Sequence, residues 1–225
     1  MRTFAILPVK RFEDAKERLR AALPPSGRRA LTRAMVHDVL DALDRVRGIA
    51  RVVVVTAEEP VRALAAARGD AVIDDRYETG QSTAAALGID RAERAGADQV
   101  LLVPGDCPAL WPEEVDGLLR RHSRGSGVVV VPDRHGTGTN GLLLSPPDAI
   151  APSFGEGSRR RHLREALEAG YTPAVEPLVS LGLDVDTPDD LEALEAALGR
   201  IPDRFARHTR AALTELRRRP AVGRR

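Results

Sequence analysis

Two lysines stand apart from the other basic residues of this chain. Among 34 lysine and arginine residues only Lys10 and Lys16 are lysines, and both follow the short apolar run 4–9. A lysine ammonium is a compact point charge, whereas the arginine guanidinium is a rigid planar fork, so the two do not replace each other in a tight phosphate-binding loop. The pair indicates a loop that binds a triphosphate. The alternative is chance, with both lysines as ordinary solvated charges.

The spacing around these lysines excludes two common nucleotide-binding loops. Neither G-x-x-x-x-G-K-[ST] nor G-x-G-x-x-G follows the run, so a P-loop ATPase and a dinucleotide dehydrogenase are not supported. Ligands of open α/β sheets bind at the carboxyl ends of the strands. We therefore expect Pro8, Lys10 and Lys16 to wrap the phosphates of a nucleotide in a loop of another kind.

A second candidate is the segment LLVPGDCP, in which an apolar run ends at Gly105, Asp106 and Cys107. A carboxylate fixed at the end of a strand suits Mg²⁺, which binds through one or two carboxylates together with substrate phosphates. The alternative is that Asp106 only caps the turn before the next helix. Cys107 is expected to fill space, because no histidine stands beside it in the sequence to activate a thiol.

The third candidate is the segment LDVDTPDDL, which ends a β-like run and begins a helix. Alternation along the run points Asp184 and Asp186 the same way, so one of them is expected to share a metal ion with Asp106. Thr187 or Asp186 would also make a suitable N-cap before a proline in the first helical turn. The two roles are compatible.

The elements that must position these loops alternate between strand-like and helical segments, a pattern typical of a mostly parallel sheet covered on both faces. We predict one three-layer α/β/α sandwich with a Rossmann-like sheet over residues 1–200. An arginine-rich tail is expected over 201–225, helical at 204–219 and then disordered. Strands are expected at 4–9, 52–56, 71–73, 100–103, 128–131 and 141–144, and helices at 28–46, 60–68, 83–95, 112–122, 159–168 and 188–198.

Composition narrows the class of protein further. The length of 225 residues fits one domain, while a formal charge of +1 and 3% aromatic residues indicate neither a basic stripe nor stacking platforms for nucleic acid. One cysteine excludes an internal disulfide and fits a reducing cytoplasm. Because no apolar run approaches the length of a membrane span and no signal-peptide pattern opens the chain, we expect a soluble cytoplasmic protein. The sequence does not indicate an oligomeric state.

In the order and combination of its motifs the chain resembles the GT-A-like nucleotidyltransferases, and most closely the guanylyltransferases that make the phospho-lactyl-type precursor of coenzyme F-420. The resemblance extends from residue 3 to about 200. It rests on PVK at 8–10 with Lys16 and RL at 18–19, PGDCP at 104–108, GTNGL at 138–142, FGEGS at 154–158 with His162, and the segment 183–191.

This resemblance implies transfer of GMP from GTP to phosphoenolpyruvate, which gives enolpyruvyl-2-diphospho-5'-guanosine and pyrophosphate. The alternative acceptors are 2-phospho-L-lactate and 3-phosphoglycerate; the arginine- and alanine-rich composition favours phosphoenolpyruvate by association. Lys10 and Lys16 would neutralise the triphosphate and the departing pyrophosphate, while Asp106 and Asp186 would hold Mg²⁺. Such a reaction needs cations and in-line placement more than covalent work by the protein.

Two further sets of contacts are expected. Backbone N–H groups of small and hydroxyl-bearing residues suit the acceptor phosphate, and we expect Thr139, Gly155 and Ser158 there, with His162 or a neighbouring arginine at the acceptor carboxylate. The base-contacting stretch ETGQST departs from the Gly-x-Asn pattern of this group of guanylyltransferases. Gln81 and Ser82 are expected to replace that asparagine, and Ser82 as a plain helix N-cap is the alternative.

Two other functions remain open from the sequence. One is a nucleotidyltransferase of the same fold that activates a different cofactor or a sugar phosphate. The other is a non-catalytic nucleotide-binding regulatory module that has kept the fold. The presence of both Asp106 and Asp186 argues against the second.

Overall fold

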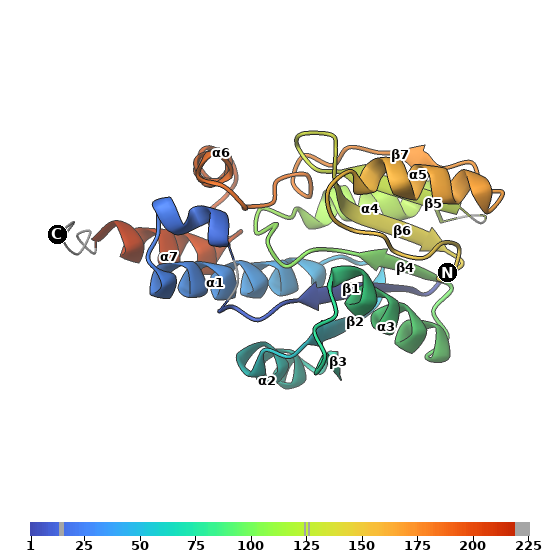
Figure 1. Cartoon of the computed structure of the whole chain (residues 1–225), viewed down its shortest axis with the longest axis horizontal. Coiled ribbons are helices and arrows are strands. Elements are labelled where there is room, and N and C mark those ends of the chain that lie inside the picture. Colours follow the sequence, from blue (N-terminus) through green and yellow to red (C-terminus); the bar gives the residue numbers. More distant parts are fainter. Residues whose placement is uncertain (14–15, 124, 126, 219–225) are drawn as a thin grey trace.

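The computed structural model describes residues 1–13, 16–123, 125 and 127–218. Across these residues one seven-stranded sheet has the strand order β3-β2-β1-β4-β6-β5-β7 (Figure 1). Each of the six predicted strands is present, and the short β7 is an addition to them. The strands are β1 (Thr3–Val9), β2 (Ile49–Thr56), β3 (Ala71–Asp74), β4 (Gln99–Leu102), β5 (Gly127–Pro132), β6 (Thr139–Ser145) and β7 (Ala174–Val175).

The sheet is mostly parallel, as predicted. β1 pairs in parallel with β2 and β4, β2 with β3, and β5 with β7. β6 runs antiparallel to both of its neighbours, β4 and β5. The segment 133–138 joins β5 to β6, and so short a connection requires antiparallel strands because a parallel crossover needs about a dozen residues or more.

The helices lie close to the predicted ranges. Four of them, α1, α2, α4 and α6, carry a proline in the first turn, where its missing N–H has no helical partner to lose. The described helices are η1 (Glu17–Ala21, 3₁₀), α1 (Pro25–Leu43), α2 (Glu59–Arg68), α3 (Gln81–Arg94), α4 (Pro112–Arg121), α5 (Ser158–Glu168), α6 (Pro188–Leu198) and α7 (Arg207–Arg218).

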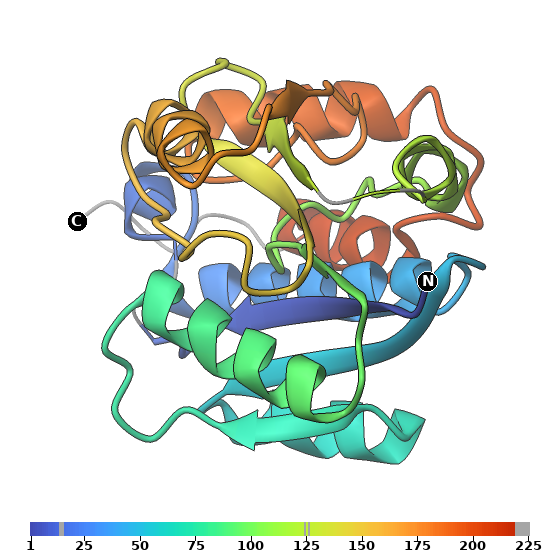
Figure 2. The ribbon, with the colours of Figure 1, turned by 90° about the vertical axis from the view of Figure 1, so that its right-hand side faces the viewer.

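Alternating side chains of β1 divide the core into two layers. Leu7 packs in a cluster with apolar residues of α1, α2 and α4 on one face of the sheet. Ile6 packs with residues of α3 and α5 on the other face. Figure 2 shows α3 on one side of the sheet and α1 on the opposite side. The predicted three-layer α/β/α sandwich is therefore confirmed.

A third apolar cluster lies at the end of the sheet toward which β1 points. It joins Leu19 of η1, Met35 of α1, Leu194 of α6 and Leu213 of α7, and Figure 1 shows these elements gathered around one end of α1. The arginine-rich tail expected over 201–225 thus contains a packed helix. The disorder expected at its end concerns residues outside the described ranges. None of the described helices has the length and apolar character needed to cross a membrane.

Candidate active site

A cavity of about 460 Å³ opens at the carboxyl end of β1. Loops that follow β1, β3 and β4 supply most of its walls, which agrees with the rule that ligands of parallel sheets bind at this edge. Of the residues selected from the sequence, seven line it: Pro8, Lys10, Lys16, Gln81, Gly105, Asp106 and Asp186.

The centre of this cavity is an ammonium held between two carboxylates. Lys16 Nζ donates to Asp106 Oδ2 and, over 2.7 Å, to Asp186 Oδ1. The Lys16 side chain is only 8% exposed. Burial disfavours the charged form of Lys16, but the two carboxylates outweigh it and raise its pKa. Lys16 is therefore a buried, protonated side chain of the cavity lining, whereas Lys10 in the same lining is exposed.

A third carboxylate, Asp184, lies beside this pair. Burial, together with the negative charge of Asp106, raises the pKa of Asp184 to about 6, against a hydrogen bond that Asn140 Nδ2 donates over 3.0 Å. The predicted β-like run at these residues is not a strand in the structure. Its alternation nevertheless holds, because Leu183 and Val185 are buried while Asp184 and Asp186 are not. The sequence ranked Asp186 above Asp184, and in the structure it is Asp186 that shares Lys16 with Asp106 and lines the cavity.

The donor set fits a divalent cation with a preference for oxygen ligands. Asp106 and Asp186 share one ammonium, so negative charge is in excess. Asp106 Oδ1 is buried and has no hydrogen-bond partner among the described residues. A buried carboxylate oxygen without a partner is costly unless a cation or a donor completes it, and Mg²⁺ takes such oxygens together with substrate phosphates.

Asn140 is a site residue to which the sequence assigned no role. Its Nδ2 donates to Leu181 O over 3.1 Å as well as to Asp184 Oδ1, and its side chain is 7% exposed. The available signal was an amide within the apolar strand β6, where a polar side chain needs a specific partner. Cys107 lies close by, fully buried, and its Sγ donates to Leu181 O. Burial raises the pKa of the Cys107 thiol, in agreement with its expected space-filling role.

The start of α6 fixes Asp186. Thr187 is the N-cap, and its hydroxyl and the Asp190 carboxylate form a capping box. Asp190 Oδ2 also accepts from the backbone N–H of Asp186 over 3.1 Å, and Arg134 Nε donates to Asp190 Oδ1 over 2.7 Å. Helix capping and placement of a site carboxylate therefore coexist in this segment, with Thr187 in the capping role.

His162 does not line the cavity, and its predicted contact with the acceptor stays a prediction. Its ring is fully buried, Nε2 accepts from the backbone N–H of Ser153 over 2.8 Å, and Nδ1 lies 3.0 Å from Thr139 Oγ1. Because Nε2 is an acceptor, Nδ1 carries the proton that is donated to Thr139. Burial, with a smaller effect of Arg161, lowers the pKa of His162 to about 4. This neutral imidazole braces the loop before α5.

The other residues expected at the acceptor, Thr139, Gly155 and Ser158, lie near His162 and the loop before α5. Thr139 and Ser158 are 7% and 1% exposed, and neither lines the cavity of Lys16. Gly155 has a left-handed φ of 109°, and its carbonyl accepts from the Ser158 N–H over 3.0 Å, so glycine is required at this turn. Arg161 Nη2 donates to the carbonyls of Ser153 and Phe154. It supports the loop and is not a solvated charge.

The two residues expected to contact the base, Gln81 and Ser82, differ in whether they line the cavity. Gln81 lines the cavity. Ser82 faces away, because its Oγ accepts from the Phe154 N–H over 2.9 Å, and Gly80 rather than Ser82 is the N-cap of α3. The N-cap role predicted for Ser82 is therefore wrong, whereas its predicted contact with the base stays a prediction. Across the cavity, Arg11 Nε donates to Glu78 Oε2 over 2.6 Å and links the loops that follow β1 and β3.

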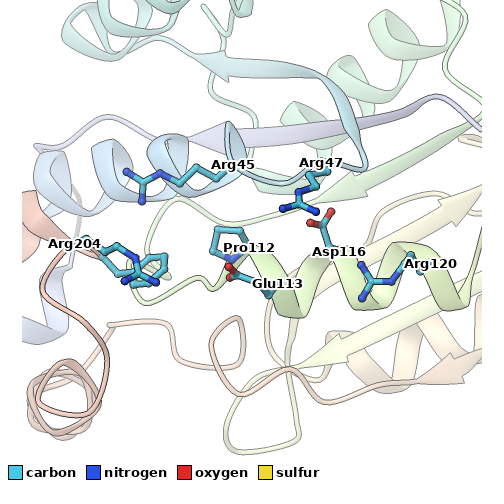
Figure 3. A pocket seen from close by; sticks show the side chains of 8 residues that line it. Arg45, Arg47, Pro112, Glu113, Asp116, Arg120 and Arg204 are labelled. Carbon is cyan, nitrogen blue, oxygen red and sulfur yellow. The ribbon is translucent and has the colours of Figure 1, made fainter.

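A second pocket, of about 290 Å³, lies between the end of α1, α4 and the segment before α7 (Figure 3). In it Arg47 and Asp116 point toward one another, and Asp116 Oδ1 also accepts from the Gly48 N–H over 3.0 Å. None of the residues selected from the sequence lines this pocket. Its carboxylates do not converge on a common point, so the site chemistry belongs to the first cavity.

A further group of possible metal ligands comprises Asp38, Asp41 and His208. The carboxylate oxygens of Asp38 and Asp41 already accept hydrogen bonds. Asp38 accepts from the first N–H groups of α7, those of His208 and Thr209, and Asp41 Oδ1 accepts from Arg68 Nη1 over 2.8 Å. This group joins α7 to α1, and the arginine beside it disfavours a metal ion.

Comparison with known proteins gives consistent results for sequence and fold. A family model described as "Guanylyl transferase CofC like" matches residues 3–199. The phosphoenolpyruvate guanylyltransferase of Conexibacter woesei is 48% identical over 219 residues, which are 97% of this chain and 98% of that protein. The 2-phospho-L-lactate guanylyltransferase of Methanothermobacter thermautotrophicus is 37% identical over 85% of this chain and 83% of its own.

The fold has counterparts among solved structures. A nucleotidyl transferase from Methanothermobacter superposes with a TM-score of 0.62 at 19% identity, over 89% of this chain and 99% of that one. At this level of identity the match supports the arrangement of the sheet and helices.

Proposed function

The chain belongs to the CofC-like guanylyl transferase family, and from that premise we propose that it transfers GMP from GTP to phosphoenolpyruvate. The observation that supports this most directly is the cluster of Lys16, Asp106 and Asp186 at the carboxyl edge of the sheet. Phosphate-binding cations beside carboxylates that could hold a metal ion suit a nucleotidyl transfer.

The reaction needs no covalent intermediate with the protein. A phosphate oxygen of the acceptor attacks the α-phosphorus of GTP, the bond to the bridging oxygen of the β-phosphate breaks, and pyrophosphate leaves. The exposed Lys10 and the buried Lys16 neutralise the triphosphate and the negative charge that builds up on the leaving group. Positioning of the two anionic reactants in line accounts for much of the remaining rate enhancement.

Asp106 and Asp186 are the residues that would hold Mg²⁺. When bound there, the ion would neutralise charge on the reacting phosphates and orient them. Asn140 contributes by keeping Asp184 oriented through the hydrogen bond to its Oδ1. Asp190 contributes by fixing the backbone of Asp186.

We propose phosphoenolpyruvate as the acceptor because a relative named phosphoenolpyruvate guanylyltransferase is 48% identical over nearly the whole chain. A relative named for 2-phospho-L-lactate is 37% identical. The acceptors differ by little more than a double bond or a hydroxyl, so the residues in the cavity do not distinguish them. The choice therefore depends on the higher identity to the relative named for phosphoenolpyruvate. The product would serve coenzyme F-420 biosynthesis, and a cytoplasmic location follows from the composition argument.

The test is pyrophosphate release by the purified protein with Mg²⁺, with GTP, ATP and CTP each combined with phosphoenolpyruvate, 2-phospho-L-lactate and 3-phosphoglycerate. We expect release with GTP and phosphoenolpyruvate. Release with GTP and another acceptor would change the acceptor alone. A different nucleotide would indicate a transferase of another pathway, and nucleotide binding without release in any combination would favour the regulatory module.

Variants test the role of the carboxylates in the same assay. Asp106→Asn should lower turnover by at least about a hundredfold, because it removes charge from the proposed cation site, while the circular dichroism spectrum stays unchanged. Asp148→Asn, at an exposed aspartate outside the cavity, is the matched control and should keep full activity. Equal activity of the two variants would exclude a metal site at Asp106.

A further inference from the structure

We propose that Lys16 occupies the cation site between Asp106 and Asp186 in the nucleotide-free protein, and that a divalent cation entering with the nucleotide takes its place. The displaced ammonium then binds the triphosphate. This inference rests on the proposed function and goes beyond it, because it makes one side chain a competitor of the metal before it becomes a ligand of the substrate.

The position of the ammonium carries the argument. Lys16 Nζ donates to one oxygen of each carboxylate, Asp106 Oδ2 and Asp186 Oδ1, and the side chain is 8% exposed. These carboxylates are the two that would hold the ion. An ammonium and a divalent cation on the same two carboxylates repel one another and compete for the same negative charge, so binding of one opposes binding of the other.

One ammonium does not satisfy this group of carboxylates. Asp106 Oδ1 is buried without a partner among the described residues, and Asp184 adds a third negative charge beside it. A divalent cation offers twice the charge and more coordination positions than an ammonium. Lys16 therefore lowers the repulsion among the carboxylates in the absence of metal without completing their coordination.

The chemistry of lysine suits exchange. An ammonium on four methylene groups can turn to a new partner, whereas an arginine would bind the carboxylates through a planar fork in a bidentate arrangement. The backbone also singles out this residue, because Lys16 has a left-handed φ of 60°, which a side chain other than glycine adopts at a cost of about 1 kcal/mol. A hydrogen bond from Leu19 N to Lys16 O, at 2.8 Å, holds that conformation at the start of η1.

The exchange couples metal binding to nucleotide binding. Without nucleotide, the cation must displace Lys16 into solvent with no new partner for the ammonium. With nucleotide, the triphosphate supplies that partner, so each ligand strengthens the binding of the other by the same factor. The nucleotide-free protein should consequently bind divalent cations weakly.

The test is the affinity of the nucleotide-free protein for Mn²⁺, measured by loss of the electron paramagnetic resonance signal of free Mn²⁺. Lys16→Met should bind Mn²⁺ at least about tenfold more tightly than the natural protein, because a unit charge in contact with the ligands is removed. Lys10→Met removes the same charge from the lining of the same cavity and should change the affinity less than about twofold, since Lys10 is exposed and its charge is screened by solvent and salt.

A second measurement uses the natural sequence and so does not depend on the folding of a variant. Protein labelled with ¹³C at lysine Cε gives signals from two lysines, Lys10 and Lys16. Titration with Mg²⁺ and a non-hydrolysable GTP analogue should move the Lys16 signal, whereas Mg²⁺ alone should move it only at much higher concentration.

The inference is wrong if Lys16→Met binds Mn²⁺ no more tightly than Lys10→Met, or if the Lys16 signal stays unchanged when both ligands are bound. These outcomes differ from failure of the proposed function, which would appear as absence of pyrophosphate release by a protein that still binds Mn²⁺. Tight Mn²⁺ binding by the natural protein without nucleotide would also overturn the inference.

Discussion

At the scale of single residues, His162 shows how a buried polar side chain supports a site without touching it. Its two nitrogens join Thr139 at the start of β6 to the Ser153 backbone in the loop before α5. Ser82 connects the same loop to α3 through the Phe154 N–H. These contacts join β6, the loop before α5 and the first turn of α3, where Gln81 lines the cavity.

The neutral state of His162 makes stability depend on pH. Its pKa is lowered to about 4 by burial, so the unfolded chain binds a proton more readily than the folded chain below the ordinary histidine pKa of about 6.5. The contribution to stability is therefore fully present above about pH 6.5 and is lost as the pH falls toward 4. By linkage, the loss amounts to about 1.4 kcal/mol at about pH 5.5.

This dependence can be measured by urea unfolding of the natural protein and of His162→Gln at about pH 7.5 and pH 5.5. We expect the free energy of unfolding of the natural protein to fall more steeply, by about 1.4 kcal/mol over this interval, than that of the variant. The other histidines are common to both proteins, so their titration cancels in the comparison. Parallel pH dependences would show that His162 is protonated in the fold.

At the scale of elements, the first turn of α6 combines stability with site geometry. Asp190 is 4% exposed, and one of its oxygens accepts from the backbone N–H groups of Asp186 and Thr187. Asp189, its neighbour in the same turn, is exposed. Both aspartates lie in the first turn, near the positive end of the helix dipole. Replacing each in turn therefore separates the effect of its charge on stability from the effect of the hydrogen bonds that Asp190 makes.

We expect Asp190→Asn to lower the free energy of unfolding by about 2 kcal/mol, because it weakens a buried charge-assisted network that includes Arg134. It should also raise the Mg²⁺ concentration needed for half-maximal pyrophosphate release, since Asp186 loses its backbone anchor. Asp189→Asn should cost at most about 1 kcal/mol and leave the Mg²⁺ requirement unchanged. If both variants had equal effects on stability and on the Mg²⁺ requirement, Asp190 would act only through its charge near the end of the helix dipole.

The elements also show which parts of the fold a sequence can predict. Strands such as β1 and helices such as α4 carry their own local pattern: apolar runs, a proline in the first turn, and a hydrophobic face. β7 is two residues long and exists through its pairing with β5, so no local pattern marks it. The same reason applies to Ser82 and His162, whose hydrogen-bond partners Phe154 and Thr139 lie 72 and 23 residues away, respectively. The sequence could select polar side chains but could not show which of them face the cavity.

At the scale of the whole molecule, the C-terminal helix is part of the structure that carries the site. α7 packs along α1, and Asp38 of α1 caps it by accepting from the His208 and Thr209 N–H groups. The apolar cluster beneath it includes Leu19 of η1 and Leu213 of α7. Since η1 begins directly after Lys16, the tail contributes to the packing that supports the lysine between the carboxylates.

Composition had marked this tail as separate, because residues 201–225 are rich in arginine and follow a glycine and a proline. Arginine is compatible with a packed helix when it lies on the outer face, as Arg217 does in its ion pair with Glu195 of α6. The apolar positions of α7 then face α1. Sequence composition averages over both faces and so could not distinguish a solvated tail from a packed helix.

Replacement of Leu213 tests whether α7 unfolds together with the sheet. Leu213 is 7% exposed, so Leu213→Ala should cost about 3 kcal/mol and shift a single cooperative unfolding transition as a whole. Leu167→Ala, at a leucine of α5 that is 63% exposed, makes the same chemical change and should cost less than about 0.5 kcal/mol. Urea unfolding followed by far-ultraviolet circular dichroism and by the fluorescence of Trp111 measures both. Small and equal costs, or a separate early transition in the Leu213 variant, would mean that the helix is an independent appendage. A large cost in one transition would mean that the packing behind Lys16 extends to the C-terminal helix.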